Sequence, residues 1–411
     1  MLAFIRDGLG AMIGGGRGYR LWVTLLALLV LAGMGAYAVQ LREGLIVTGM
    51  SDQVSWGFYI ANFAFLVGIA AAAVLLVIPA YVFHRQDIKA VVLIGEGLAV
   101  AAVLSAMLFV VVDLGRPDRA LHLLPFIGRL HWPQSLLTWD VVVLTGYLLL
   151  NLAIPFYVHY CHYRGREPRF GAYFPWVVLA MFWAISIHTV TAFLFAASSA
   201  RPFWSVSLLG PRFIATAFVS GPALIILVLQ AVRRFTRYPV ADSVIDTLAL
   251  IMTVALQVSL FFVGVELFTD FYNEGSHAAS IRYLYFGLEG ANRLVPWVWS
   301  ALALLLVAVV ILTINPLRRR RRLLNAACVL AFVGIWIDKG MGFVVPGFIP
   351  TPLGEVFEYS PTIVELTLAA GIWAFGALVF TLLARASSAI ELGEVRAGAP
   401  RRVSARAVAS G

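Results

Sequence analysis

The stretch "AVVLIGEGLAVAAVLSAMLFVVVDLGRPDRALHLL" (residues 90–124) shows the pattern that decides the fold. Its apolar run to residue 113 has the length of about 20 residues that a helix needs to cross a lipid bilayer. The run stops at Asp113, and two arginines, a proline and a second aspartate follow within six residues. We therefore expect a membrane-spanning helix whose charged end, Asp113–Arg119, is either a plain surface turn or one wall of a site.

The same apolar pattern recurs along the whole chain of 411 residues. Hydrophobic residues make up 61% of the sequence and charged residues only 12%, whereas about 25% of the residues in soluble domains are charged. The apolar runs cover residues 21–40, 56–82, 90–113, 136–158, 174–198, 213–232, 244–267, 294–314, 323–345 and 361–384. This composition predicts an all-α polytopic membrane protein with about ten transmembrane helices.

The order of the runs allows an internal repeat. If the runs alternate across the membrane, helices 2–5 and helices 6–9 both start from the outer face. Their first segments, "SWGFYIANFAF" (55–65) and "GPRFIATAFVSG" (210–221), share an aromatic-then-small pattern. We expect two parallel four-helix bundles flanked by helices 1 and 10.

Lysine and arginine are distributed unevenly between the two sides of the membrane. With the N-terminus inside, 21 of the 30 basic residues fall on the inner side, including the five arginines from Arg385 onward. This bias follows the positive-inside rule and predicts a bacterial cytoplasmic membrane protein with both termini in the cytoplasm. The net charge of +9 then reflects topology, so nucleic acid is not an expected partner, and the run Arg318–Arg322 fits an anchor on anionic lipid.

The chain divides into a cytoplasmic N-terminal segment (1–20), one transmembrane domain (21–384) and a basic tail (385–411). The tail is rich in Ala, Gly, Ser and Arg, a composition typical of disorder. The first span has a basic flank and "AYA" at residues 36–38, which resembles a signal-peptide cleavage site. The other helices keep their orientation in either case, and we favour a retained helix.

Few side chains are suited to hold a redox cofactor. Cys161 and Cys328 are too few for iron–sulfur ligation and form no C-x-x-C-H haem site. His188 is the histidine that lies well inside a predicted span, so the paired ligands of a haem b are missing. We expect no haem, iron–sulfur cluster or other metal site in this chain. A role in electron transfer would need the redox centres of a partner.

Polar residues gather at one depth, the outer third of the membrane. An ionisable group in a bilayer costs about 2.5–3.5 kcal/mol on insertion scales, so each is a candidate functional residue. The outer set comprises Trp56, Tyr59, Asn62, Asp113, Asp140, His188, Glu266, Asp338, Lys339 and Glu365. The grouping favours a pocket for a ligand with an apolar body and a proton-exchanging head. A quinone fits this description, because a carboxylate or a histidine can exchange its two protons.

Several of these residues also have a structural interpretation. Asp338 and Lys339 would form a neutralised pair within one helix. Asp113 and Arg116 would form a helix-end cap with a loop salt bridge. His188 would have a hydrogen-bonded packing role, and this alternative stays as open as that of a ligand.

The remaining polar residues allow further alternatives. Trp56 lies at the depth of the aromatic belt, where tryptophan is common without a functional role. Glu266 and Glu365 lie near helix ends, where carboxylates are often interfacial. The residues that we place on a proton path by depth are Glu96 and Asp246 in the inner part and Asp338 and Glu365 in the outer part.

Six motifs in order resemble the NrfD/PsrC family of quinone-interacting membrane subunits, and most closely its ten-helix DsrP type. They cover about residues 20–390. The motifs are "SWGFYIANF" (55–63), "VVDLGRPDR" (111–119), "PQSLLTWD" (133–140), "IHTVTAFLF" (187–195), "ARPFW…LLGPRFIATAF…GPALIIL" (200–227) and "WIDKGMGFVVPGFIPTPLGEVFEYSPT" (336–362).

The resemblance implies a subunit without its own redox cofactor that binds a quinone or quinol, either menaquinone or ubiquinone, near the outer face. It implies electron exchange with a periplasmic ferredoxin-like iron–sulfur protein. In the DsrP type, the same complex also contains a multihaem cytochrome c, a haem b membrane subunit and a cytoplasmic subunit similar to heterodisulfide reductase. Sulfur metabolism and respiration are the settings that such a complex implies.

By position, the quinone pocket of such a subunit would involve side chains from four helices. They are Trp56, Tyr59, Asn62, Asp113, Arg116, Asp140 and His188. Of these, Asp140, His188 and Asp113 are the candidates for proton transfer. Arg119 would face the docked iron–sulfur partner.

Three functions are compatible with the sequence. The favoured one is a quinol:iron–sulfur oxidoreductase subunit, which is active only within a complex and whose turnover could be coupled to proton translocation. A secondary transporter would suit a parallel repeat with buried charges, but its site would lie at the midplane of the membrane. A passive anchor would hold the partner subunits without chemistry of its own.

Overall fold

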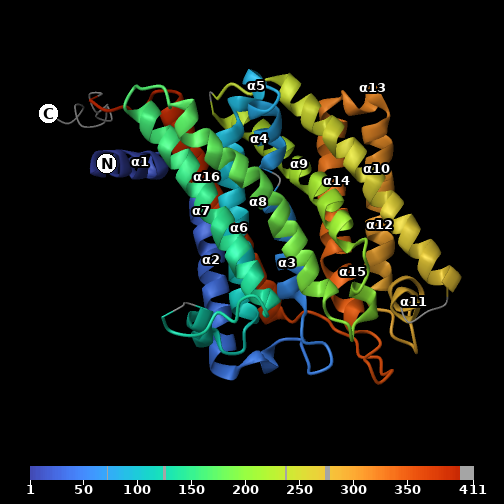
Figure 1. Ribbon diagram of the computed structural model, residues 1–411. Coiled ribbons are helices and arrows are strands. Elements are labelled where there is room, and N and C mark those ends of the chain that lie inside the picture. Colours follow the sequence, from blue (N-terminus) through green and yellow to red (C-terminus); the bar gives the residue numbers. More distant parts are fainter. Residues whose placement is uncertain (72, 124–125, 237, 274–277, 399–411) are drawn as a thin grey trace.

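The computed structural model describes residues 1–71, 73–123, 126–236, 238–273 and 278–398 (Figure 1). Its long helices are α2 (Arg17–Glu43), α3 (Phe58–Ala71), α6 (Val92–Asp113), α7 (Leu136–Tyr163), α8 (Phe170–Ala196), α9 (Leu209–Phe235), α10 (Asp242–Asn273), α12 (Val295–Thr313), α14 (Arg321–Lys339) and α16 (Ile363–Glu391). The shorter helices are α1 (Leu2–Ile13), α4 (Val74–Tyr81), α5 (Gln86–Lys89), α11 (Ala278–Phe286), α13 (Asn315–Arg318) and α15 (Met341–Val344). Short 3-10 helices are η1 (Leu45–Val47), η2 (Pro117–Leu123), η3 (Pro202–Trp204) and η4 (Val345–Phe348).

The described residues form an all-helical protein without a strand. Within the part of the chain that the structure describes, ten spans are long and apolar enough to cross a membrane, which confirms the predicted number. The second span consists of α3 followed by α4, and the ninth continues from α14 through α15 to residue 348. Most spans extend beyond the apolar runs, because polar residues at their ends continue the helical turns.

The two terminal segments differ in part from the expected ones. The N-terminal segment contains α1, which packs against α16 through Phe4 and Ile390. The predicted tail begins inside α16, which continues to Glu391. The last part of that tail, residues 399–411, lies outside the described residues.

Helix α3 lies at the centre of the molecule. It packs against α6, α8, α9, α14 and α16, and all its described side chains are buried. Its glycine and alanine residues allow this because small side chains let neighbouring helices approach closely. The helices follow one another across the molecule in Figure 1, with α6, α7 and α8 on one side of α3 and α9, α10, α12 and α14 on the other. The arrangement as two repeated four-helix bundles stays a prediction.

Helices α2 and α16 form a closely packed pair at the edge of the molecule. A side chain at Gly33 of α2 would lie 2.7 Å from the Cα atom of Gly371 of α16, so the backbones touch at this crossing. Much of α2 otherwise carries exposed apolar side chains, as expected of a helix that faces lipid.

The predicted site residues lie mostly toward one end of the helices. At this end α2, α6, α8, α10 and α14 finish and α3, α7, α9, α12 and α16 begin, and it is the lower end in Figure 1. We call it the site end. The N-terminus and the end of α16 lie near the opposite end (Figure 1).

Candidate functional site

Asp140 of α7 is held by a neighbouring helix. It lies in the second turn of α7, a helix that begins after Ser135, whose side chain accepts a hydrogen bond from the Thr138 backbone. Asp140 is 2% exposed, and its Oδ1 atom accepts a hydrogen bond of 2.7 Å from the hydroxyl of Thr191 on α8. The carboxyl group is therefore buried with a defined orientation between two helices.

His188 and Lys339 are buried polar residues without hydrogen-bond partners among the described residues. His188 lies one turn before Thr191 on α8 and is 2% exposed. Its Nδ1 and Nε2 atoms make no hydrogen bond of acceptable geometry, although the Ala184 carbonyl lies one turn earlier. Lys339 ends α14, is 3% exposed, and its Nζ atom also has no partner. The charge of Lys339 acts on His188, so the two groups lie within electrostatic range of each other.

The space around the Lys339 ammonium is shaped by small residues. Its Nζ atom lies 4.2 Å from the ring centre of Phe213 on α9. A Cβ atom at Gly68 of α3 would lie 3.3 Å from Nζ and 3.6 Å from the Cα atom of Ala217. We use the name polar row for Asp140, Thr191, His188 and Lys339, which come from α7, α8 and α14.

A buried ion triad lies next to the polar row. Arg212, in the first turn of α9, donates hydrogen bonds to Glu266 of α10 and to Asp338 of α14, the latter at 3.0 and 3.2 Å. The three side chains are only 12–17% exposed. Asp338 therefore pairs with Arg212 and not with Lys339, so the interpretation of Asp338 and Lys339 as a pair is wrong. Adjacent residues of a helix point in different directions, which explains why Asp338 and Lys339 do not pair with each other.

A second cluster joins α2, α3, α6 and α16, and we call it the junction cluster: Gln40, Tyr59, Asp113, Tyr359 and Glu365. The Tyr59 hydroxyl donates to Gln40 Oε1 at 2.6 Å, and Gln40 Nε2 donates to the backbone carbonyl of Val112, also at 2.6 Å. The charges of Asp113 and Glu365 act on Tyr59, so Asp113 lies within electrostatic range of this cluster. Asp113 Oδ1 is buried and has no partner in the described part of the chain.

Glu365 is fully engaged in hydrogen bonds. Its Oε2 atom accepts from the backbone amides of Gly49 at 2.7 Å and Thr362 at 2.8 Å, and the Thr362 side chain in turn accepts from the Glu365 amide. This capping box starts α16. The Tyr359 hydroxyl donates to Glu365 Oε1 and accepts from the Phe58 amide. Burial, followed by the charge of Glu365, raises the pKa of Tyr359, so its hydroxyl stays a donor.

Asn62 is likewise occupied by neighbouring helices. Its Oδ1 atom accepts hydrogen bonds from the indoles of Trp336 on α14 at 3.0 Å and Trp373 on α16 at 2.8 Å. Its Nδ2 atom donates to the Phe58 carbonyl at 2.8 Å. Both lone pairs of the amide oxygen are used, so in this arrangement Asn62 connects three helices.

Trp56 belongs to an aromatic group at the site end. Its ring stacks on Trp204 with centroids 5.6 Å apart and meets Phe195 edge-on at 5.5 Å. Phe195 in turn contacts Phe213, and the Lys339 ammonium lies over the face of the Phe213 ring. The aromatic group therefore continues from the loop before α3 to the polar row.

The two arginines of the charged turn are exposed. Arg116 forms two hydrogen bonds of 3.1 Å to Asp118, and the side chains of this pair are 68% and 62% exposed. The Arg116 guanidinium lowers the pKa of Asp118. Arg119 is exposed as well. The turn thus places Asp113 inside and the two arginines outside.

Of the two inner carboxylates, one is buried and one is not. Glu96 of α6 is 4% exposed, and its Oε2 atom has no hydrogen-bond partner in the described ranges. Its charge acts on Tyr81, Tyr147 and Tyr173, which lie within electrostatic range of it. Asp246 of α10 is 58% exposed and pairs with Arg321 at 2.7 Å. Only Glu96 therefore lies in the interior.

Sequence reasoning missed several residues of these clusters. Arg212 stands in the motif "GPRFIATAF", where its position indicates only an outer basic residue, and its partners lie 54 and 126 residues away. No sequence motif indicates the roles of Gln40 and Tyr359, because these roles depend on contacts between segments that are distant in the sequence. The capping box could have been found from the spacing Thr-x-x-Glu at residues 362–365.

The fold and the clusters define a polytopic helical membrane protein with buried polar residues concentrated toward one end of its helices. Within the described ranges, no group of three or more His, Cys, Asp or Glu side chains is arranged to hold a metal ion. The family model "Polysulphide reductase, NrfD" matches residues 46–341. The chain belongs to this NrfD family.

Three relatives match nearly the full length of the chain. A putative membrane subunit of dimethyl sulfoxide reductase from Halobacterium salinarum is 28% identical and covers 89% of each chain. The "Hdr-like menaquinol oxidoreductase integral membrane subunit" of Archaeoglobus fulgidus is 25% identical over 88% of this chain and 91% of its own. The "Menaquinone reductase, integral membrane subunit" of Nitratidesulfovibrio vulgaris is 24% identical over 89% and 90%. The chain is thus similar to membrane subunits of oxidoreductase complexes, two of which are named for menaquinol or menaquinone.

Proposed function

We propose that this protein is the quinone-reactive membrane subunit of a redox complex and that its quinone site lies at the polar row. The observation that carries the proposal is the pair His188 and Lys339, whose buried nitrogen atoms have no partner within the described ranges. Buried polar groups are nearly always hydrogen-bonded, so such a pair fits a site that awaits a polar ligand. The menaquinol and menaquinone relatives indicate the chemical class of that ligand.

The chemistry of the row suits quinol oxidation. Oxidising a quinol releases two protons and two electrons. The Asp140 carboxylate would accept one hydroxyl proton and a neutral His188 imidazole the other, as general bases. The Lys339 ammonium would donate a hydrogen bond to the carbonyl oxygen that forms. The two electrons would pass one at a time to the iron–sulfur clusters of a partner, and reduction of a quinone would use the same groups in reverse.

The other candidate residues take supporting roles in this proposal. Asp113 would line the rim with Trp56 and Tyr59, since its Oδ1 atom is buried and unpartnered in the described structure. Asn62 would position helices, because its amide is occupied. Arg116 would lie at the outer rim of the site and Arg119 would face the docked partner, which fits their exposure at the site end.

The proposal places the site end at the periplasmic face and both termini in the cytoplasm. The excess of arginine near the opposite end supports this orientation. The acceptor would be a periplasmic ferredoxin-like iron–sulfur protein. The DsrP type with its cytochrome and heterodisulfide-reductase-like subunits is the particular complex that the sequence motifs favour.

A proton path is a second part of the proposal. Glu96 is the one predicted path residue that is buried with an unpartnered oxygen in the described structure. Tyr147, near Glu96, lies two turns along α7 from Asp140. Protons from the polar row would reach Glu96 over this face of α7, with intervening water, and leave at the cytoplasmic side.

The test uses the purified complex with its iron–sulfur partner. A short-chain menaquinol is added without oxygen, and the cluster absorbance and EPR signal of the partner are followed. We expect the clusters to be reduced, and a quinone-site inhibitor to block this. An Asp140→Asn variant should lose about 100-fold in rate while the complex still assembles, as expected for a lost general base.

The outcome also separates the competing functions. Clusters that respond to dithionite but not to quinol or quinone would favour a passive anchor or a transporter. Full turnover in both Asp140→Asn and His188→Ala would refute the assignment to the polar row but leave the redox function standing.

A further inference from the structure

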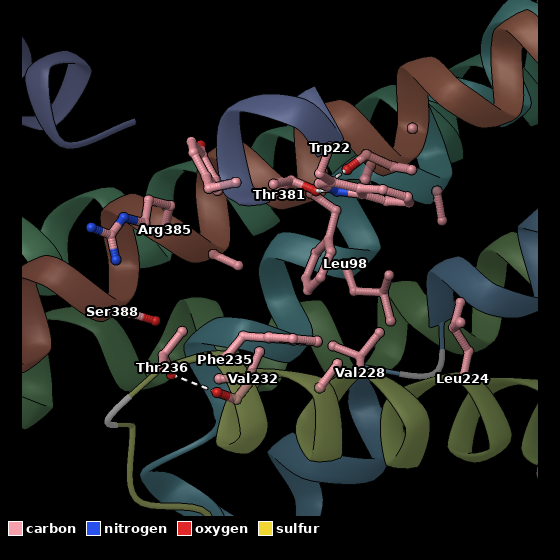
Figure 2. Close-up of a pocket in the computed structure, with 18 of the residues that line it drawn as sticks. Trp22, Leu98, Leu224, Val228, Val232, Phe235, Thr236, Thr381, Arg385 and Ser388 are labelled. Atoms are coloured by element: carbon pink, nitrogen blue, oxygen red, sulfur yellow. Dashed lines mark hydrogen bonds between the residues drawn. The ribbon is translucent and has the colours of Figure 1, made fainter. Parts of the chain in front are cut away.

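A large groove lies at the opposite end from the polar row. It has a volume of about 820 Å³ and is formed by α2, α3, α6, α9 and α16 (Figure 2). Its walls are mainly apolar, with Leu98, Leu224, Val228 and Phe235 among them. None of the predicted quinone-pocket residues lines it. The groove is therefore a feature that the proposed redox function does not use.

Polar side chains are concentrated at one end of this groove. Arg385, Ser388 and Thr236 lie together there, and Leu224 marks the other end (Figure 2). Ser388 is 2% exposed and its Oγ atom has no hydrogen-bond partner among the described residues. It thus presents a buried, unsatisfied hydroxyl to the groove. The Thr236 hydroxyl donates to the Val232 carbonyl at 2.6 Å and accepts from the Tyr238 backbone amide at 3.1 Å, so it is already engaged within the chain.

Arg385 carries a positive charge without an acidic partner in the described structure. Its Nε atom donates to the Gly14 carbonyl at 3.3 Å, and its guanidinium lies 6.0 Å from the ring centre of Tyr19. The residues that line the groove include no aspartate or glutamate. Exposed arginines at the same end, Arg17, Arg20 and Arg234, add to the positive charge around the opening. The electrostatics favour an anionic group at this end.

The length of the groove corresponds to one leaflet of a bilayer. Along α16 its lining extends from Ser388 to Trp373, and 15 residues of helix span about 22 Å. Half of a hydrocarbon core is about 15 Å thick, and the headgroup region adds several ångströms. The polar end lies near the N-terminus and the end of α16, at headgroup depth, and the apolar part reaches toward the middle of the membrane.

We propose that the groove binds one anionic glycerophospholipid of the leaflet on the side of the N-terminus. The lipid phosphate would contact the Arg385 guanidinium and the Ser388 hydroxyl, because a guanidinium is suited to bidentate contact with phosphate oxygens. An acyl chain would fill the apolar part. A quinone would place its polar head differently, at the deep end of the groove, where Ser105 offers a single hydroxyl. The position of the charge at the membrane surface favours the phospholipid.

The test measures lipid retention on the full chain in its assembled complex. The complex is delipidated in detergent, mixed with phosphatidylglycerol or phosphatidylcholine of identical acyl chains, and examined by native mass spectrometry. We expect the wild-type chain to retain one phosphatidylglycerol with at least a tenfold preference. Arg385→Gln should abolish this preference. Arg322→Gln, which removes an exposed arginine from the same end of the molecule but outside the groove, should leave it unchanged.

A second variant tests the apolar part. Ala377→Trp puts a bulky side chain into the groove wall and should reduce retention of both lipids. If the complex with Ala377→Trp does not assemble, Arg385→Gln still tests the proposal, because it changes only the mouth of the groove.

Three results would overturn the proposal. The first is an equal effect of Arg385→Gln and Arg322→Gln, which would indicate unspecific attraction. The second is a quinone in organic extracts of the complex that disappears in the Ala377→Trp variant. The third is a disulfide from Ser388→Cys to another membrane subunit, which would identify a partner helix as the occupant. Lipid retention does not depend on quinol turnover, so failure of the redox proposal would leave this readout intact.

Discussion

The junction cluster, apart from Asp113, and the ion triad differ from His188 and Lys339 of the polar row in how their polar atoms are satisfied. Glu365 accepts hydrogen bonds from three donors, and Arg212 is paired with two carboxylates. In the polar row, His188 and Lys339 have no partner in the described residues, although they are equally buried. Satisfied buried groups hold helices in place, and unsatisfied ones are costly unless a ligand or water completes them. Depth in the membrane therefore does not by itself distinguish structural from functional residues.

This comparison predicts two kinds of response to mutation. Changes at the satisfied residues Arg212 and Tyr359 should lower stability and leave turnover per assembled complex unchanged. Changes in the polar row should lower turnover and leave stability nearly unchanged. The three variants below test this division, in order of decreasing expected effect.

Replacing Arg212 should have the largest effect on stability. Arg212→Gln would leave the buried carboxylates of Glu266 and Asp338 without their cation, and breaking such a pair costs about 3–5 kcal/mol. We expect poor assembly or a much lower thermal midpoint, measured by fluorescence-detected size-exclusion chromatography after heating. Arg322→Gln is the control, because this arginine is exposed. A stable Arg212→Gln complex that has lost quinol turnover would place Arg212 in the functional group instead.

Replacing Lys339 should mainly affect turnover. Lys339→Met keeps the length of the side chain and removes the ammonium. The variant loses the cation–π contact with Phe213, which is worth about 0.5–2 kcal/mol. It also removes the cost of keeping an unpaired charge buried, and this gain offsets the loss. We expect a change in stability below about 1 kcal/mol and a roughly 100-fold loss of quinol oxidation.

Lys89→Met is the matched control, since Lys89 lies at the opposite end of the helices beside Tyr81. Cluster reduction by quinol would be measured in both variants. Normal turnover with a large loss of stability in Lys339→Met would contradict the division into two kinds of cluster.

Replacing Tyr359 should have the smallest effect. Tyr359→Phe leaves Glu365 Oε1 and the Phe58 amide without a partner, which costs about 1–3 kcal/mol. We expect a moderately lower thermal midpoint and unchanged turnover per assembled complex. Arg116→Gln, at the exposed pair with Asp118, should leave the midpoint unchanged. A loss of turnover in Tyr359→Phe at unchanged stability would instead connect the junction cluster to the quinone site.

The fold was largely predictable from the sequence, because the length of an apolar run directly indicates a membrane span. The depth of Asp140 and His188 followed in the same way, and both are buried as expected of candidate site residues. Their surroundings were not predictable. Thr191 approaches Asp140 across 51 residues of sequence, and Arg212 meets Asp338 across 126.

Residues at the same predicted depth in the membrane show most clearly what the sequence does not predict. Glu365 and Lys339 both lie near the ends of their helices, yet one is a capping residue and the other is unpaired among the described residues. Asp246 belongs to the surface because α10 turns it toward Arg321. The rotation of a helix about its own axis decides such cases, and it depends on packing against distant helices.

The contact between Gly33 of α2 and Gly371 of α16 has a consequence for biosynthesis. The first long helix of the chain packs against the last one, 338 residues later. At the synthesis rate of about 5–20 residues per second, α2 waits on the order of 20–70 s before its partner leaves the ribosome. During this interval its glycine-containing face is covered only by lipid or by the insertion machinery. The α2–α16 pair can therefore form only after translation has passed residue 371.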